Sequence, residues 1–277
     1  MGAAAIFARY ALAGAPPLAV AAARLCIAAL MLLLIAAVHR TRETPTRAQR
    51  TVLWIAGAAL AVHFGTWIAS LDYTTVAIST LLVSVTPLWT ALYDALVRGR
   101  RYPIAVPLAF VGGIVGLALI TSGKHSPPPV PGHAVLGAAL ALAGSVAFAA
   151  YLLLVREVRA ALGTRTIVTH TYTAAALALV VAAATAHQAP PGMHAYSAWG
   201  GIIAMALISQ LLGHTGMNAA LRWFSPSAVS FSTLLEPVFA AVLALVIFGE
   251  TLSALAVAGA CVLLASIGAV LWIAPDS

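Results

Sequence analysis

The sequence predicts an all-α membrane protein of ten transmembrane helices, arranged as two five-helix repeats of inverted topology. Three observations predict this fold. Of the 277 residues 62% are apolar, the apolar residues form stretches long enough to cross a bilayer, and two stretches 150 residues apart resemble each other. Lys and Arg number only 14 and Asp and Glu only 7, whereas about a quarter of the residues are charged in a soluble domain. Too little polar surface remains for a soluble globule, so a soluble fold is excluded.

Nine stretches have the length and hydropathy of full membrane spans. They cover Pro17 to Val38, Thr51 to Leu71, Val76 to Val97, Pro103 to Thr121, Ala134 to Val155, Thr166 to Ala186, Ala198 to Ala220, Pro226 to Phe248 and Ser253 to Ile273. Before them, Gly2 to Ala13 is apolar apart from Arg9 but too short to cross about 30 Å of hydrocarbon. It lacks the features of a signal peptide. We interpret it as a first helix truncated at its amino end, which brings the expected count to ten.

The basic residues of the joints predict how the chain is oriented. Eleven of them fall on one side of the membrane, and Lys124 alone falls on the other. The eleven are Arg40, Arg42, Arg47, Arg50, Arg98, Arg100, Arg101, Arg156, Arg159, Arg165 and Arg222. The positive-inside rule then places both termini in the cytoplasm.

An internal repeat appears at an offset of 150 residues. The stretch Thr75 to Pro87 (TVAISTLLVSVTP) lies over the stretch Ser225 to Pro237 (SPSAVSFSTLLEP). Because each half has five spans, an odd number, the second half must cross the membrane upside down, which is a transporter architecture. The expected domains are residues 1–123 and 132–274, joined by a periplasmic linker at 124–131.

Pro87 and Pro237 occupy equivalent places near the middle of their spans. A proline displaces the carbonyl four residues earlier, here that of Val83 or Thr233. Freed carbonyls at this depth suit an ammonium group, so we expect these residues to shape a substrate cavity or to act as hinges, the alternative being a packing kink. Glu236 is the one acid near a span centre. It is either a substrate-amine or proton site, or a structural carboxylic acid.

Two polar stripes lie at nearly equivalent places in the two halves. His63 and Trp67 are one turn apart, and Gln210, His214 and Asn218 follow one another at intervals of four. We expect the two histidines, the tryptophan and the glutamine to line the cavity. The alternative for each histidine is an interhelical hydrogen bond. No carboxylate or cysteine stands at ligand spacing from either histidine, so no metal site is expected.

Several pieces of sequence together resemble the drug/metabolite transporter superfamily, EamA type. They are IFARYAL around Arg9, AAARLCIAAL around Arg24, the polar span ending at Pro87, and LLEPVFAAVLALVIFGE from Leu234 to Glu250. The resemblance covers nearly the whole chain, and within the superfamily the chain looks most like bacterial exporters of aromatic amino acids. It implies a ten-helix secondary transporter of the bacterial inner membrane that exports amino acids or similar small metabolites by alternating access. It also implies that the chain is no enzyme and uses no cofactor.

The resemblance also bears on two intramembrane arginines, since a basic residue recurs in the family at the places of Arg9 and Arg24. It implies that they hold the fold or act as gate residues by bonding backbone carbonyls, or else bind a carboxylate. Asp94 and Arg98, four residues apart near a span end, predict an ion pair on a helix surface.

Other functional classes are disfavoured. No nucleotide-binding GxxxxGK[ST] string exists, which excludes an ATP-driven pump, and one central acid does not suffice for an intramembrane hydrolase. Scattered basic residues do not indicate nucleic acid as a partner. The expected partners are a small-molecule substrate and membrane lipid, and the chain is expected to work as a monomer. A multidrug or cationic-compound exporter and a channel-like pore remain the alternatives.

Overall fold

A computed structural model describes residues 2–38, 43–122, 130–220 and 235–273. The regular elements in these residues are helices, which confirms the all-α prediction. In chain order they are α1 (Ala4–Leu12), α2 (Pro17–Val38), α3 (Arg47–Tyr73), α4 (Val76–Val83), α5 (Thr86–Leu96), α6 (Ala105–Ser122), α7 (Ala134–Arg159), α8 (Thr164–Thr185), α9 (Tyr196–Ala204), η1 (Met205–His214), α10 (Thr215–Ala220), α12 (Leu235–Phe248) and α13 (Ala254–Ile273).

Six helical segments of the described chain are long and apolar enough to cross a membrane. They are Pro17–Val38, Arg47–Tyr73, Val76–Leu96, Ala134–Arg159, Thr164–Thr185 and Tyr196–Ala220. Three further expected spans are present as shorter apolar helices, namely α6, α12 and α13. The multi-pass membrane fold is therefore supported, and the count of ten stays a prediction.

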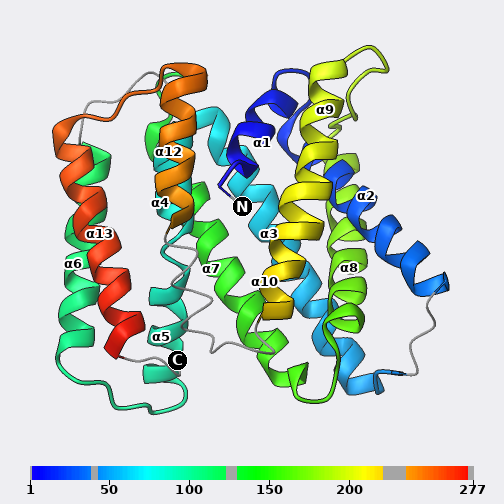
Figure 1. The fold of residues 1–277 in the computed structure, drawn as a ribbon, viewed down its shortest axis with the longest axis horizontal. Coiled ribbons are helices and arrows are strands. Elements are labelled where there is room, and N and C mark those ends of the chain that lie inside the picture. Colours follow the sequence, from blue (N-terminus) through cyan, green and yellow to red (C-terminus); the bar gives the residue numbers. More distant parts are fainter. Residues whose placement is uncertain (1, 39–42, 123–129, 221–234, 274–277) are drawn as a thin grey trace.

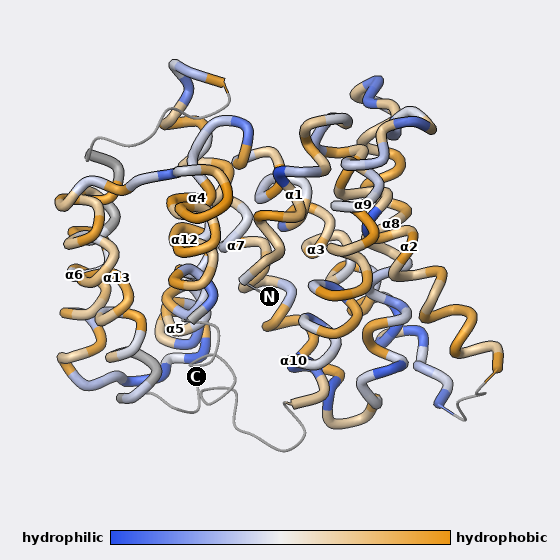
Figure 2. Tube along the Cα trace, turned by 45° about the horizontal axis from the view of Figure 1, so that its top comes forward, coloured by the Kyte–Doolittle hydropathy of each residue, from blue (hydrophilic) through white to orange (hydrophobic). Residues whose placement is uncertain are grey.

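The helices run side by side and their joints gather at two ends of the molecule (Figure 1). Hydrophilic residues concentrate in the joints and near the helix ends, and apolar residues cover most of the helices between them (Figure 2). We call the end with the α3–α4 and α12–α13 joints the Arg9 end, and the opposite end, with the α5–α6 and α7–α8 joints, the Asp94 end. Large apolar side chains such as Leu34, Leu108 and Val246 are exposed along the helices, as lipid contact requires.

The close packing of helices depends on small residues. One example joins α6 and α13, where a Cβ on Gly116 would lie 2.8 Å from the Gly259 carbonyl oxygen and one on Gly259 would lie 2.7 Å from that of Gly116. In α3, a Cβ on Gly57 would lie 2.5 Å from the Ala174 Cβ of α8. The GGIVG stretch around Gly116 thus makes a helix contact within the chain.

The helix that contains Pro87 is broken where the sequence predicts. Its first part, α4, ends at Val83, and α5 begins at Thr86 with the proline in its first turn. The Val83 carbonyl accepts a hydrogen bond from Thr86 Oγ1 at 3.0 Å, which partly replaces the lost amide. Pro237 lies in the first turn of α12, and Thr233 falls outside the described residues.

A π-helix interrupts the segment that carries Gln210 and His214. The segment begins as α9 and ends as α10, but the ten residues of η1 between them have π geometry. In a π-helix each amide bonds the carbonyl five residues earlier, which widens the helix locally. Of the predicted stripe, Gln210 and His214 lie in η1 and Asn218 lies in α10, where its Nδ2 donates to the His214 carbonyl at 2.9 Å.

Candidate functional site

Five aromatic or imidazole rings meet where α3, α7 and η1 come together. We call them the central cluster; they are His63, Phe64, Trp67, Phe148 and His214. The His63 ring stacks on Phe148, with centroids 4.7 Å apart, and lies 6.4 Å from the His214 ring. His214 in turn meets Phe64 edge-on at 5.4 Å. The structure thus brings together three residues that the sequence assigned to one cavity: His63, Trp67 and His214.

His63 is held in a defined orientation by the backbone of α7. Its Nδ1 lies 2.9 Å from the Gly144 carbonyl oxygen, and its side chain is buried. The α7 residue at this place is a glycine, and a Cβ there would lie 3.2 Å from Thr66 Oγ1 of α3, closer than most Cβ contacts. A carbonyl only accepts, so Nδ1 donates and the neutral ring presents Nε2 as an acceptor.

Arg24 of α2 reaches into the central cluster and is completely buried. Its Nη2 donates to Gln210 Oε1 of η1 at 2.7 Å. Its guanidinium carbon lies 4.1 Å from the Phe64 ring centroid and 5.9 Å from that of Trp67. The sequence suggested bonds to backbone carbonyls or to a carboxylate, whereas the partners of Arg24 in the structure are a glutamine side chain and two aromatic rings.

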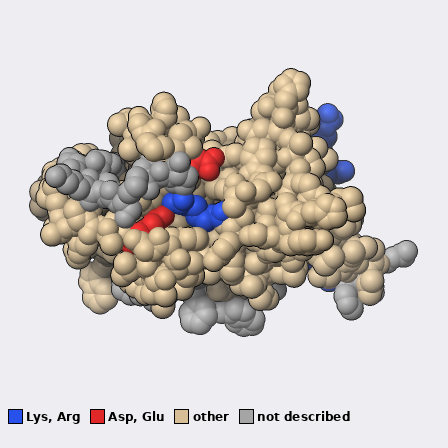
Figure 3. Space-filling model, turned by 90° about the horizontal axis from the view of Figure 1, so that it is seen from above, with Lys and Arg blue, Asp and Glu red and all other residues tan. Residues whose placement is uncertain are grey.

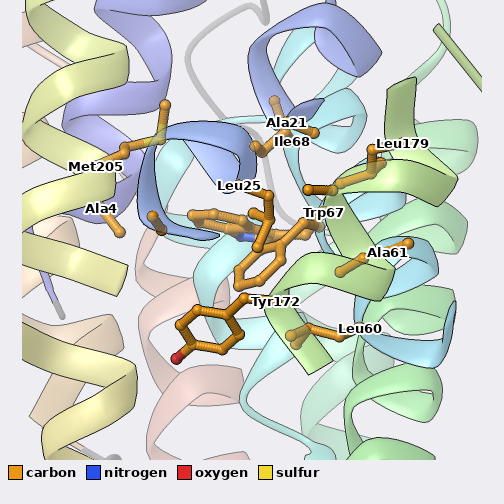
Figure 4. Packing of buried hydrophobic residues seen from close by; sticks show 14 of the residues in the cluster. Ala4, Ala21, Leu25, Leu60, Ala61, Trp67, Ile68, Tyr172, Leu179 and Met205 are labelled. Carbon is orange, nitrogen blue, oxygen red and sulfur yellow. The ribbon is translucent and has the colours of Figure 1, made fainter. Parts of the chain in front are cut away.

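Apolar side chains of α2, α3 and α8 surround this region. Trp67 lies among Leu25, Ile68 and Leu179, and Tyr172 of α8 lies beside Leu60 (Figure 4). All are buried. The polar groups at the cluster are therefore surrounded by apolar and aromatic side chains, where a hydrogen bond is stronger than it is in water.

Polar residues beyond the cluster fix the end of η1. Asn218 of α10 donates to the His214 carbonyl at 2.9 Å and to the Tyr151 hydroxyl of α7 at 3.4 Å. Tyr172 lies 3.2 Å from Thr215 Oγ1, which also donates to the Gln210 carbonyl at 3.3 Å. These bonds connect α7 and α8 to the π-helix and hold it in register.

Two further predicted binding residues, Glu236 and Val83, are not members of the central cluster. Glu236, in the first turn of α12, is partly buried and within electrostatic range of Arg24. Val83 packs against the hydrophobic core, and its carbonyl already accepts one hydrogen bond. Sequence reasoning missed Phe64, Phe148 and Tyr172. Phe64 adjoins His63 in HFGTW, whereas nothing local distinguishes Phe148 from other apolar residues.

At the Arg9 end, one ion pair connects distant parts of the chain. Arg9 Nη2 lies 2.5 Å from Glu250 Oε1, and Glu250 Oε2 accepts from the Val76 amide of α4 at 2.8 Å. The arginine binds a carboxylate and not the expected carbonyls. Burial raises the pKa of Glu250, and the charge of Arg9 opposes that shift. This end is hollowed, with basic atoms inside the hollow and acidic atoms at its sides (Figure 3).

At the Asp94 end, four charges form a network between α5 and α7. Arg156 donates two hydrogen bonds to Asp94, at 2.9 and 3.2 Å, and Arg98 Nε lies 3.6 Å from the same carboxylate. Arg98 also pairs with Glu157 at 2.7 Å. The predicted contact between Asp94 and Arg98 is present, but the closer partner comes from another helix, which helical spacing could not reveal.

No group of three His, Cys, Asp or Glu able to hold a metal ion occurs in the described part of the chain.

The model of the EamA-like transporter family matches residues 1–122 and 135–272. The chain therefore belongs to the EamA-like transporter family, whose members are membrane transporters of small molecules.

Comparison with solved structures supports the same fold. A crystal structure of a protein aligns with 97% of this chain and 95% of its own, at a TM-score of 0.64 and 18% identity. At this identity the likeness establishes the fold alone. No curated protein matches the sequence.

Proposed function

We propose that the chain is a secondary carrier that exports amino acids with aromatic or other apolar side chains, or similar small metabolites, by alternating access. The observation that carries this proposal is the central cluster. Histidines at nearly equivalent places in the two halves, His63 and His214, meet there with their rings 6.4 Å apart. A carrier places its substrate where its two repeats meet, near the bilayer midplane.

The pairing of helices supports an inverted repeat of residues 1–123 and 132–274. In such a repeat α1 corresponds to α7, α2 to α8, α3 to the α9–η1–α10 segment, α4–α5 to α12, and α6 to α13. A contact between two helices should then recur between their two counterparts. The α3–α7 contact recurs as the contact of the segment with α1, and the α3–α8 contact recurs as that of the segment with α2. The helices of the pairs α2–α8, α4–α12 and α6–α13 are each other's counterparts, and the two helices of each pair are in contact.

The proposed cargo follows from the chemistry of the cluster. The rings of Trp67 and Phe148 offer faces to an aromatic or apolar side chain. His63 Nε2, the Val83 carbonyl and Glu236 offer acceptors to an ammonium group. We further propose that Pro87 and Pro237 serve as hinges, that both termini lie in the cytoplasm of a bacterium, and that the monomer is the working unit.

The test is uptake of labelled amino acids and cationic drugs into proteoliposomes that contain the purified protein. We expect at least one apolar or aromatic amino acid to be transported. His63→Ala or His214→Ala should lower its initial uptake rate by about tenfold, the factor for one lost hydrogen bond and ring contact. His194→Ala, which alters an exposed histidine in the α8–α9 joint, is the control. Uptake of cationic drugs without any amino acid would favour the multidrug alternative.

A further inference from the structure

Several buried donors around Arg24 have no acceptor. A guanidinium carries five N–H groups, and the one hydrogen bond of Arg24 runs from Nη2 to Gln210. Its Nε and Nη1, and the indole Nε1 of Trp67 beside it, are buried and have no hydrogen-bond partner among the described residues. All three are donors, so the group that would satisfy them is an acceptor.

The charge of Arg24 is also unbalanced at short range. Among the residues that the structure describes, Arg9 pairs with Glu250 and Arg156 pairs with Asp94, but no carboxylate lies within ion-pair distance of Arg24. Glu236 acts on it only at longer range. An arginine buried at membrane depth is costly unless a counter-charge and hydrogen bonds compensate it.

We propose that Arg24, together with the indole of Trp67, binds the carboxylate of the transported molecule. This inference rests on the proposed carrier function and makes it more specific. The carboxylate supplies the missing acceptor atoms and the missing negative charge, and charge-assisted hydrogen bonds of this kind are the strong ones. The cargo class is then an aromatic or apolar carboxylate, with or without an amino group, and compounds that carry only a positive charge are excluded.

The role differs from that of a fold-holding arginine in one measurable respect. A structural guanidinium would be satisfied before any ligand arrives, and ligands with and without a carboxylate would bind alike. A binding guanidinium discriminates strongly between them, because the ligand lacking the carboxylate leaves its buried donors unpaired.

The test uses four probes that share a phenyl ring: phenylalanine, phenylalaninamide, 3-phenylpropionate and phenethylamine. Binding to the detergent-solubilised full chain is measured by the shift in its melting temperature, and competition is measured against labelled phenylalanine in proteoliposomes. We expect phenylalanine and 3-phenylpropionate to bind. Phenylalaninamide and phenethylamine should bind about tenfold more weakly or worse, as the loss of a charge-assisted hydrogen bond implies.

Two variants connect this preference to the named donors. Arg24→Lys keeps the charge but loses the fork of donors, and should weaken carboxylate binding by about tenfold. Trp67→Phe keeps an aromatic ring but lacks the indole N–H, so this variant should fold. It should nevertheless bind 3-phenylpropionate several-fold more weakly than the wild-type protein does. Trp54→Phe is the matched control, since Trp54 lies on the same helix but is exposed.

The outcomes separate this inference from the carrier proposal. If phenethylamine binds as tightly as 3-phenylpropionate and both are transported, the carrier proposal stands and the carboxylate site is refuted. If nothing is transported but only the carboxylates raise the melting temperature, and Trp67→Phe reduces that shift, the site stands and the carrier proposal fails. If no carboxylate shifts the melting temperature, or if phenyl phosphate binds more tightly than all four probes, the assignment to a carboxylate is overturned.

Discussion

The two ends of the helix bundle are held together by ion pairs of different construction. Among the described residues at the Arg9 end, a single ion pair joins α1 to the loop after α12, and the side chains of Arg9 and Glu250 are only 15% and 10% exposed. At the Asp94 end two acids and two arginines form a network, in which the side chains of Arg98 and Glu157 are 46% and 57% exposed.

The difference indicates how sensitive each end is to the loss of one charged group. That sensitivity depends more on whether the remaining charges have a second partner or reach water than on the number of ion pairs. If one member of the Asp94 network is lost, the others retain a second partner or reach water, so the free energy of unfolding should fall only slightly. If Glu250 is lost, Arg9 stays buried without the partner on which it depends. We therefore expect loss of one ionic partner to weaken the Arg9 end more than the same change weakens the Asp94 end. A carrier needs ends that can open separately.

The first prediction concerns which compartment each end of the bundle faces, and its expected result is all-or-none. The α5–α6 and α7–α8 joints, which carry basic residues, lie at the Asp94 end, so we expect this end and the carboxyl terminus to be cytoplasmic. Alkaline phosphatase fused to the carboxyl terminus should then be inactive, while a cytoplasmic reporter fused at the same place should be active. An active phosphatase fusion would reverse the assignment of the ends.

Removal of the Glu250 carboxylate should have the largest effect on stability. Glu250→Ala leaves the Arg9 guanidinium and the Val76 amide without their acceptor, and we expect the free energy of unfolding to fall by about 2 kcal/mol. Unfolding of the protein in mild detergent measures this. The control, Glu157→Ala at the Asp94 end, should cost no more than about 0.5 kcal/mol. Equal losses would contradict the difference between the ends.

The Arg9 end should also respond to pH. Because burial raises the pKa of Glu250, its ion pair with Arg9 exists above this raised pKa and is lost as the pH falls through it. Acidifying the Arg9 side from about pH 8 to about pH 5 should therefore change the transport rate by a few-fold. Glu250→Gln should abolish the response, and Glu236→Gln should retain it. A response that disappears with Glu236→Gln alone would identify Glu236 as the proton site instead.

The smallest effect is expected for the most exposed arginine of the Asp94 network. Arg98→Ala removes a 3.6 Å contact to Asp94 and an exposed pair with Glu157, while the two hydrogen bonds from Arg156 remain. The free energy of unfolding should change by less than about 0.5 kcal/mol. A loss as large as that of Glu250→Ala would mean that the network is not redundant.

The sequence predicted those features that depend on local pattern or on the repeat. Hydropathy was enough for the all-helical membrane fold, and proline chemistry was enough for the break between Val83 and Thr86. The offset of 150 residues placed His63 and His214 at matching sites, and the structure brings their rings together. These inferences needed no knowledge of which helix packs on which.

Features that depend on long-range packing could not be predicted from the sequence. Phe148 joins the site because α7 lies against α3, and Arg156 reaches Asp94 for a similar reason, since α5 and α7 are neighbours. Arg24 donates to Gln210, which is 186 residues away in the sequence and lies in the π-helix η1. Neither this contact between distant helices nor the π-helix follows from a local apolar pattern.

Counterflow in proteoliposomes tests the central claim, alternating access through the central cluster, most directly. Vesicles loaded with unlabelled substrate at high concentration are diluted into labelled substrate, and accumulation of the label is followed over time. A carrier should accumulate label transiently above equilibrium, and His63→Ala and His214→Ala should each abolish the overshoot while His194→Ala preserves it. Label that only equilibrates in the wild-type protein, at a rate independent of the internal substrate, would indicate a pore and contradict the account.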